Sequence, residues 1–78
     1  MTLKIISAQE VVFQGEVTSV TLPGEMGSFT VLKNHASLVS ILTAGEITYI
    51  STDGGEHNAA ITGGIVDVDN NIVSVCTY

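Results

Sequence analysis

Three β-branched residue types, valine, isoleucine and threonine, supply 27 of the 78 residues, whereas alanine and leucine together supply only ten. β-branched side chains lose rotamer freedom in a helix and pack well on a pleated sheet. No stretch of useful length repeats its apolar residues with the period of a helix. The chain is therefore predicted to be all-β.

The apolar residues gather in short runs that glycine, proline, asparagine and aspartate separate. Such runs are typical of strands, and regular turn signals between them are typical of a sandwich or barrel. We therefore expect a small two-sheet β-sandwich, or flattened barrel, of eight to ten short strands that forms a single domain over residues 1–78. The predicted strands are Leu3–Ala8, Val11–Phe13, Glu16–Leu22, Phe29–Leu32, Leu38–Thr43, a strand from Glu46, His57–Thr62, Val66–Asp69 and Ile72–Thr77.

Side-chain alternation predicts which residues share a face of each strand. In residues 16–22, Thr18, Val20 and Leu22 are expected on one face and Val17, Ser19 and Thr21 on the other. Val66 and Val68 alternate with Asp67 and Asp69, which indicates an edge-like amphipathic strand. Ile47 and Tyr49 are expected to share a face.

Four turns are predicted from local sequence. Gln14-Gly15 is expected to reverse the chain, and Asp53-Gly54-Gly55 is a strong hairpin signal. Gly63-Gly64 permits a bend between sheets. Asn70-Asn71 tolerates left-handed backbone and therefore suits a two-residue turn.

The charge balance of the chain excludes one class of partner. Eight acidic and two basic residues give a formal net charge of −6. Nucleic-acid binding needs a basic footprint, and none is present. The N-terminal residues do not read as a signal peptide, and no run reaches the ~18 apolar residues that a membrane span needs. The single cysteine, Cys76, is expected to be a buried, inert thiol in a reducing compartment.

Candidate chemistry is weak throughout the chain. No nucleophile elbow and no zinc-type ligand set occurs, and the run from Asp67 to Asn71 lacks the glycine and glutamate that a calcium loop requires. His57 is expected to face solvent, whereas His35 either bonds local backbone or serves an interface. Met26 is expected to be exposed and Phe29 to join the core.

The order of the turns and strands resembles one known family, the N-terminal β-sandwich domain of the epsilon subunit of F-type ATP synthases. The resemblance covers essentially the whole chain and lies in the order and spacing of several short motifs. The matching positions are Leu22-Pro23-Gly24, Glu25, Gly27, Val31-Leu32, His35-Ala36, Leu38–Leu42, Gly45-Glu46-Ile47, Thr62-Gly63-Gly64 and Val66–Asn71.

The resemblance implies a non-catalytic subunit of the central rotor stalk, without a cofactor. Such a subunit would link the gamma subunit to the membrane c-ring and couple proton- or sodium-driven rotation to ATP synthesis. It would sit at the cytoplasmic face of the inner (plasma) membrane as a peripheral part of the complex. Most family members continue into a C-terminal helical hairpin, which inhibits hydrolysis and in some binds ATP. This chain stops at Tyr78, so neither inhibition nor ATP binding is expected of it.

The same resemblance implies two contact surfaces. The positions that match the c-ring loop are Glu25, Met26, Gly27 and Ser28, and those that match the gamma-facing surface are Ser7, His35 and Ser40. Two departures bear on these surfaces: the family often has glutamate at the position of Ser28, and many members have proline-glycine where this chain has Lys33-Asn34.

An alternative remains from the residues themselves, namely a free-standing β-sandwich that binds a ligand such as a carbohydrate. Carbohydrate modules usually present an aromatic platform. The chain has no tryptophan, two tyrosines and two phenylalanines, so it is poorly supplied for that role.

Overall fold

The computed structural model describes all 78 residues, and it contains eight β-strands and no helix. The prediction of an all-β sandwich is therefore confirmed. No helix that could span a membrane is found. The strands are β1 (Thr2–Ile6), β2 (Val11–Gly24), β3 (Gly27–Leu32), β4 (Leu38–Leu42), β5 (Gly45–Ser51), β6 (Glu56–Ile61), β7 (Gly64–Asp69) and β8 (Ile72–Thr77).

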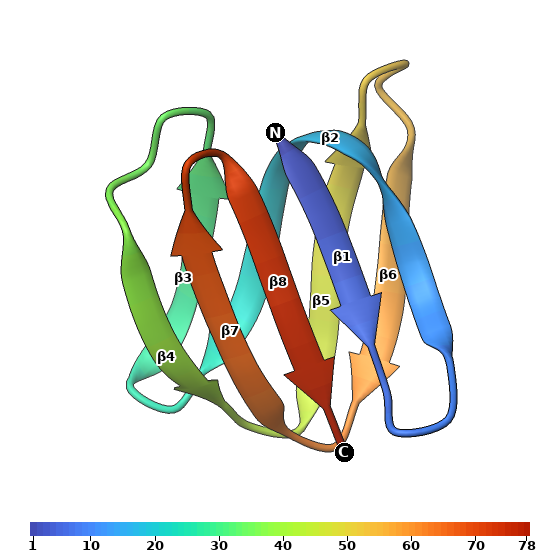
Figure 1. Cartoon of the computed structure of the whole chain (residues 1–78), viewed down its shortest axis with the longest axis vertical. Helices are drawn as coiled ribbons and strands as arrows, with labels where there is room; N and C mark the ends of the chain where they lie inside the picture. Colours follow the sequence, from blue (N-terminus) through green and yellow to red (C-terminus); the bar gives the residue numbers. More distant parts are fainter.

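Two layers of strands face each other (Figure 1). The front layer runs β4-β7-β8-β1, and the back layer runs β3-β2-β5-β6. β1 and β8 pair in parallel, whereas the other pairs are antiparallel. The first part of β2 pairs with β1 and its second part pairs with β3 and β5, so this one strand belongs to both layers.

The core lies between the two layers and consists of 14 buried apolar residues. No buried side-chain nitrogen or oxygen lacks a hydrogen-bond partner. The close packing of the apolar side chains in this core makes a small sandwich stiff. The core residues are Leu3, Ile5, Val17, Val20, Leu22, Val31, Leu42, Ile47, Tyr49, Ile61, Val66, Val68, Val73 and Val75.

The expected chain reversal at Gln14-Gly15 is wrong, because β2 continues through it. Leu3 pairs with Gly15, and the ladder between β1 and β2 keeps one register from the Thr2–Glu16 pair to the Ile5–Phe13 pair. The ring of Phe13 folds over Gly15, where a Cβ atom would lie only 3.0 Å from that ring. The glycine therefore makes room for a neighbouring aromatic ring and does not turn the chain.

The predicted alternation in residues 16–22 also fails at one point. A register shift between Val17 and Ser19 in the pairing of β2 with β5 marks a bulge. A bulge changes which face the following residues occupy. As a result Val17 and Val20 are both buried, although simple alternation put them on opposite faces.

Two further expectations about strands were wrong. β7 is not an edge strand, because it pairs with β4 on one side and β8 on the other. Its alternation reflects one buried and one exposed face, which a central antiparallel strand also has. Cys76 is exposed, since the residues of β8 that turn inward are Val73 and Val75.

The other turns and faces agree with the predictions. Asn70 and Asn71 have positive φ values of 49° and 60° and form the two-residue turn between β7 and β8. Ile47 and Tyr49 are both buried, and β5 and β6 form the hairpin around Gly54.

Candidate functional site

The β2–β3 hairpin ends in an exposed two-residue turn. Gly24 pairs with Gly27, which leaves only Glu25 and Met26 outside the ladder. Met26 is 99% exposed, and Glu25 and Ser28 are exposed as well. The predicted c-ring residues therefore lie together at one end of the sandwich, at the lower left of Figure 1. Phe29 is half-buried and packs against the core.

Contacts to the front layer hold this tip in place. The Glu25 amide donates to the Ile41 carbonyl oxygen at 2.9 Å, and the Thr43 amide donates to the Pro23 carbonyl oxygen at 2.8 Å. Gly24 has no room for a side chain, because a Cβ atom there would lie 2.7 Å from the Gly27 carbonyl oxygen. We call residues 25–28 the tip. Its exposed side chains include those of Glu25 and Met26, and the hydrogen bonds to the front layer hold its backbone in place.

The three residues that matched the gamma-facing surface do not form one cluster. Ser7 follows β1 at the same end of the sandwich as the tip. His35 lies in the loop between β3 and β4 at the opposite end, where its Nδ1 is 2.7 Å from the Ala36 carbonyl oxygen. Ser40 is half-buried in β4, on the inner side with Leu42, and its hydroxyl donates to the Ile41 carbonyl oxygen at 3.3 Å.

The loop that carries His35 is fastened across the fold. The backbone amide of Asn34 donates to Asn71 Oδ1 at 2.6 Å, and the side-chain Nδ2 of Asn71 donates to Asn34 Oδ1 at 3.1 Å. This reciprocal pair joins the β3–β4 loop to the β7–β8 turn. The Lys33-Asn34 departure from the family pattern is therefore accommodated by a side-chain pair between two turns.

A surface that the sequence analysis missed lies on the outer side of the front layer. Ile41 pairs with Ile65, Ile65 with Cys76, and Cys76 with Ile6, so these four side chains form one row across β4, β7, β8 and β1. Ile41 is 54% exposed and Ile65 49%, and the neighbouring Val39 on the same face is 71% exposed. We call these five residues the apolar row. Large contiguous apolar patches often mark interaction sites, so the apolar row is a candidate contact surface.

A local signal for this surface was present in the sequence. β4 is apolar at consecutive positions, with Val39 and Ile41 alternating with the inward Leu38 and Leu42. A strand that is apolar on both faces indicates that both faces become covered. The other members of the row could not be predicted from the sequence, because they depend on which distant strands pair with one another.

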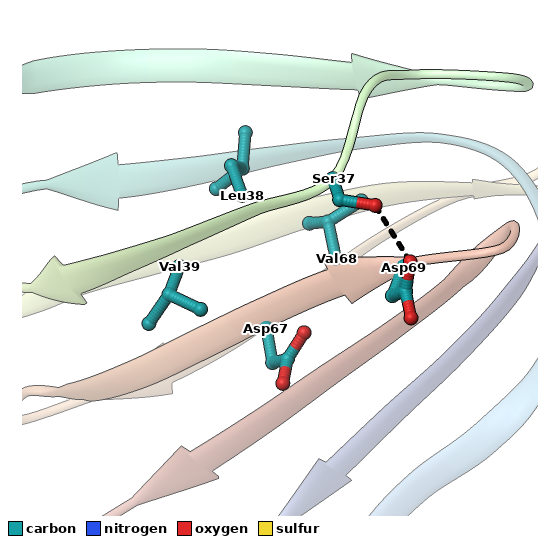
Figure 2. A pocket seen from close by; sticks show the side chains of 6 residues that line it. All are labelled: Ser37, Leu38, Val39, Asp67, Val68 and Asp69. Carbon is teal, nitrogen blue, oxygen red and sulfur yellow. Dashed lines mark hydrogen bonds between the residues drawn. The ribbon is translucent and has the colours of Figure 1, made fainter.

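Acidic side chains border the apolar row. Asp67 and Asp69 line a shallow hollow of about 370 Å³ together with Ser37, Leu38, Val39 and Val68. Figure 2 shows Val39 and Asp67 pointing to the outer side and Leu38 pointing the opposite way. Ser37 Oγ donates to Asp69 Oδ1 at 2.6 Å, which fixes that carboxylate. The outer face thus combines apolar area with negative charge.

A serine, an aspartate and a histidine meet at the β5–β6 hairpin, but not in the order that nucleophilic catalysis needs. Ser51 Oγ donates to Asp53 Oδ1 at 2.5 Å, and His57 Nε2 lies 3.4 Å from the same Ser51 Oγ. In a catalytic triad the carboxylate orients the histidine, whereas here it accepts from Ser51 and from the Gly55 amide at 2.9 Å. The cluster therefore shapes the turn. His57 is exposed, as expected, and its ring stacks on Tyr49.

The Asp53 carboxylate gives the hairpin a pH dependence. Its hydrogen bond from Ser51, and then that from Gly55, hold the pKa of Asp53 below the ordinary value of 3.8. A carboxyl with a depressed folded-state pKa stabilises the fold above its unfolded pKa and loses that effect as pH falls through the folded value. Asp53→Asn should therefore be less stable than the parent near pH 7, and the difference should shrink in urea titrations as the pH is lowered below about 4. A difference that stays constant across this range would contradict the assignment.

Comparison with known proteins places the chain in a family. Residues 1–78 match the family model described as "ATP synthase, Delta/Epsilon chain, beta-sandwich domain". The chain belongs to this family. The resemblance noted from the epsilon-type motifs is thereby confirmed over the whole sequence.

Named relatives of this epsilon-type domain agree. An ATP synthase epsilon chain from Bordetella petrii is 39% identical over 75 residues, covering 96% of this chain and 53% of the relative. One from a Sulfurovum species is 46% identical over 69 residues, covering 88% of this chain and 54% of the relative. The chain thus spans about half the length of the curated relatives it matches.

Solved structures share the same fold. A chain in the Euglena gracilis mitochondrial ATP synthase, resolved with OSCP, F1 and c-ring, superposes with a TM-score of 0.89 at 25% identity, over 96% of this chain and 48% of that one. A chain in the central stalk and c-ring of the Tetrahymena thermophila mitochondrial ATP synthase gives a TM-score of 0.81 at 13% identity, over 99% of this chain and 62% of that one. The second likeness supports the fold alone.

Proposed function

We propose that this domain is a non-catalytic part of the central rotor stalk of an F-type ATP synthase, linking the gamma subunit to the c-ring and coupling ion-driven rotation to ATP synthesis. The observation that carries the proposal is the family match over residues 1–78, a span that we treat as a single domain. The complex would hold it at the cytoplasmic face of the inner (plasma) membrane, with contact to the membrane only through other subunits. Torque transfer requires a stiff body with two adhesive surfaces, and the packed core of the sandwich supports the stiffness.

The tip is the proposed contact to the c-ring. Glu25, Met26, Gly27 and Ser28 project from one end of the sandwich, and the bonds from Glu25 and Thr43 fasten them to the front layer. Met26 supplies exposed apolar area, and methionine adapts readily to an irregular surface. Glu25 supplies negative charge for basic loop residues, a role that Ser28 does not fill.

The gamma subunit is the proposed partner of the front layer's outer face. The apolar row crosses this face from β4 to β1. Ser7 directly follows β1 and His35 precedes β4, so these two of the family's gamma-facing positions lie at opposite ends of the strands that form this face, whereas Ser40 lies on the inner side of β4. Asp67 and Asp69 favour a partner surface whose rim is basic.

Disulfide cross-linking tests the placement of the tip. Met26→Cys in a Cys76→Ser background should cross-link to a cysteine in a c-ring polar loop under oxidation, because the tip is exposed and fixed. Thr52→Cys, which is exposed in the β5–β6 turn at the opposite end, is the matched control and should not cross-link. If gamma still co-purifies but Met26→Cys gives no product, or Thr52→Cys gives as much, the proposed orientation is wrong.

We expect neither ATP binding nor carbohydrate binding of this domain. The chain has only two lysines, one in β1 and one in the β3–β4 loop, and the net charge of −6 disfavours a triphosphate. Phe13 and Tyr49 pack against each other at the edge of the core, with ring centroids 4.4 Å apart and the ring planes tilted by 34°. These rings are therefore committed to packing and do not form an exposed platform for a sugar.

A further inference from the structure

β6 has a free edge at the end of the back layer. It pairs with β5 through all six of its residues and has no second neighbour. None of the backbone hydrogen bonds made outside the strand ladders involves residues 56–61. The backbone groups of β6 that point away from β5 therefore face solvent, and such a row is a template for another strand.

The edge of β6 lacks most of the features with which proteins usually protect an exposed strand. These features are proline, charged side chains and above all lysine, a bulge or a covering loop, and of these β6 carries one charged side chain, Glu56. Residues 56–61 contain neither proline nor lysine, and the pairing of β5 with β6 shows no register shift. The side chains of Asn58, Ala59 and Ala60 are short, so they leave the backbone in the middle of the edge accessible to another strand.

The two faces beside this edge differ in chemistry. On one side of β6, Ala59 packs against the core, Ile61 is buried and the exposed His57 ring stacks on Tyr49, so this side is apolar at Ala59 and Ile61. Glu56, Asn58 and Ala60 point to the outer side, and Glu46 of β5 lies directly across from Ala60. Because the alanine side chain is short, a long side chain from an added strand can pass over Ala60 and reach the Glu46 carboxylate.

We propose that the free edge of β6 accepts, as an antiparallel added strand, an extended segment of a partner protein in which arginine or lysine alternates with apolar residues. The basic residues would lie opposite Glu56 and Ala60 on the outer side, and the apolar residues would lie opposite Ala59 and Ile61. Backbone hydrogen bonds supply affinity in this mode, and alternate side chains supply specificity. The inference does not depend on the stalk role proposed above.

The test uses the ¹⁵N-labelled domain and a designed probe, the capped peptide Val-Arg-Val-Thr-Val-Arg, at low salt. In antiparallel register its arginines lie opposite Ala60 and Glu56. Saturable amide shifts should be confined to β6 and β5, with a Kd no weaker than about 5 mM, the weak range expected of so short a strand. A peptide with glutamate in place of both arginines should bind at least about fivefold more weakly.

Charge variants separate the proposed edge from general attraction to an acidic protein. Glu46→Gln with Glu56→Gln should weaken binding about fivefold, whereas Glu10→Gln with Glu16→Gln, which removes the same charge elsewhere, should leave binding unchanged. The proposal is overturned if no saturable shift appears at β6, or if both variant pairs weaken binding equally. It is also overturned if β6 shifts with protein concentration alone, since a second copy would then occupy the edge.

Discussion

Gly64→Ala is expected to destabilise the domain by at least about 3 kcal/mol, which is enough to leave much of so small a fold unfolded. A Cβ atom at Gly64 would lie 2.3 Å from the Cys76 carbonyl oxygen and 3.0 Å from Thr77 Cα. Both atoms are backbone of β8, so no side chain can move to make room. β7 cannot shift either, because it is paired with β4 as well as β8.

Urea unfolding followed by far-ultraviolet circular dichroism measures this cost. Gly54→Ala is the matched control, because Gly54 has a φ of +90° but nothing within 4 Å of an added Cβ. Only the backbone conformation then opposes the substitution, at about 1–2 kcal/mol. Equal losses at the two positions would show that the close approach of β7 to β8 is not what requires glycine at residue 64.

Ile41→Asp with Ile65→Asp is expected to weaken association with the gamma subunit by at least about 100-fold, if the apolar row packs on gamma as proposed. The two isoleucines are adjacent in the row, and burying two carboxylates in an apolar contact without partners costs several kcal/mol. Both side chains are half-exposed in the free domain, at 54% and 49%, so the fold should survive the change.

Co-purification with tagged gamma measures the loss, and circular dichroism of the free variant checks its fold. Thr30→Asp with Leu32→Asp adds the same charge to exposed positions of β3 in the back layer and should leave association intact. If the variant with both Ile41→Asp and Ile65→Asp still binds gamma, the gamma contact lies on another surface. Equal loss in both variants would point to net charge and not to a specific face.

Much of the fold could be predicted from local sequence because its causes are local. β-branched composition set the strand content, and Asn70-Asn71 and Asp53-Gly54-Gly55 specified their hairpins through the backbone conformations those residues tolerate. The tip was also predictable, since Pro23-Gly24 and Gly27 define a turn and the residues between them are exposed.

Several local rules failed where one residue's environment depended on a distant segment. Gly15 was predicted to be a turn, but the Phe13 ring over it and the pairing with Leu3 keep β2 extended. The bulge after Val17 appears only in the register with β5, and it turns both Val17 and Val20 inward.

The sequence by itself determined the all-β content, the hairpins, the inward alternation of β7 and the family. The tertiary structure alone decided that β7 is central, that Cys76 is exposed, and that Ile41, Ile65, Cys76 and Ile6 form one row. Alternation along a strand reports only that its two faces differ. Which strands become neighbours, and which faces stay uncovered, depends on pairing between residues far apart in the chain, and no local pattern encodes that pairing.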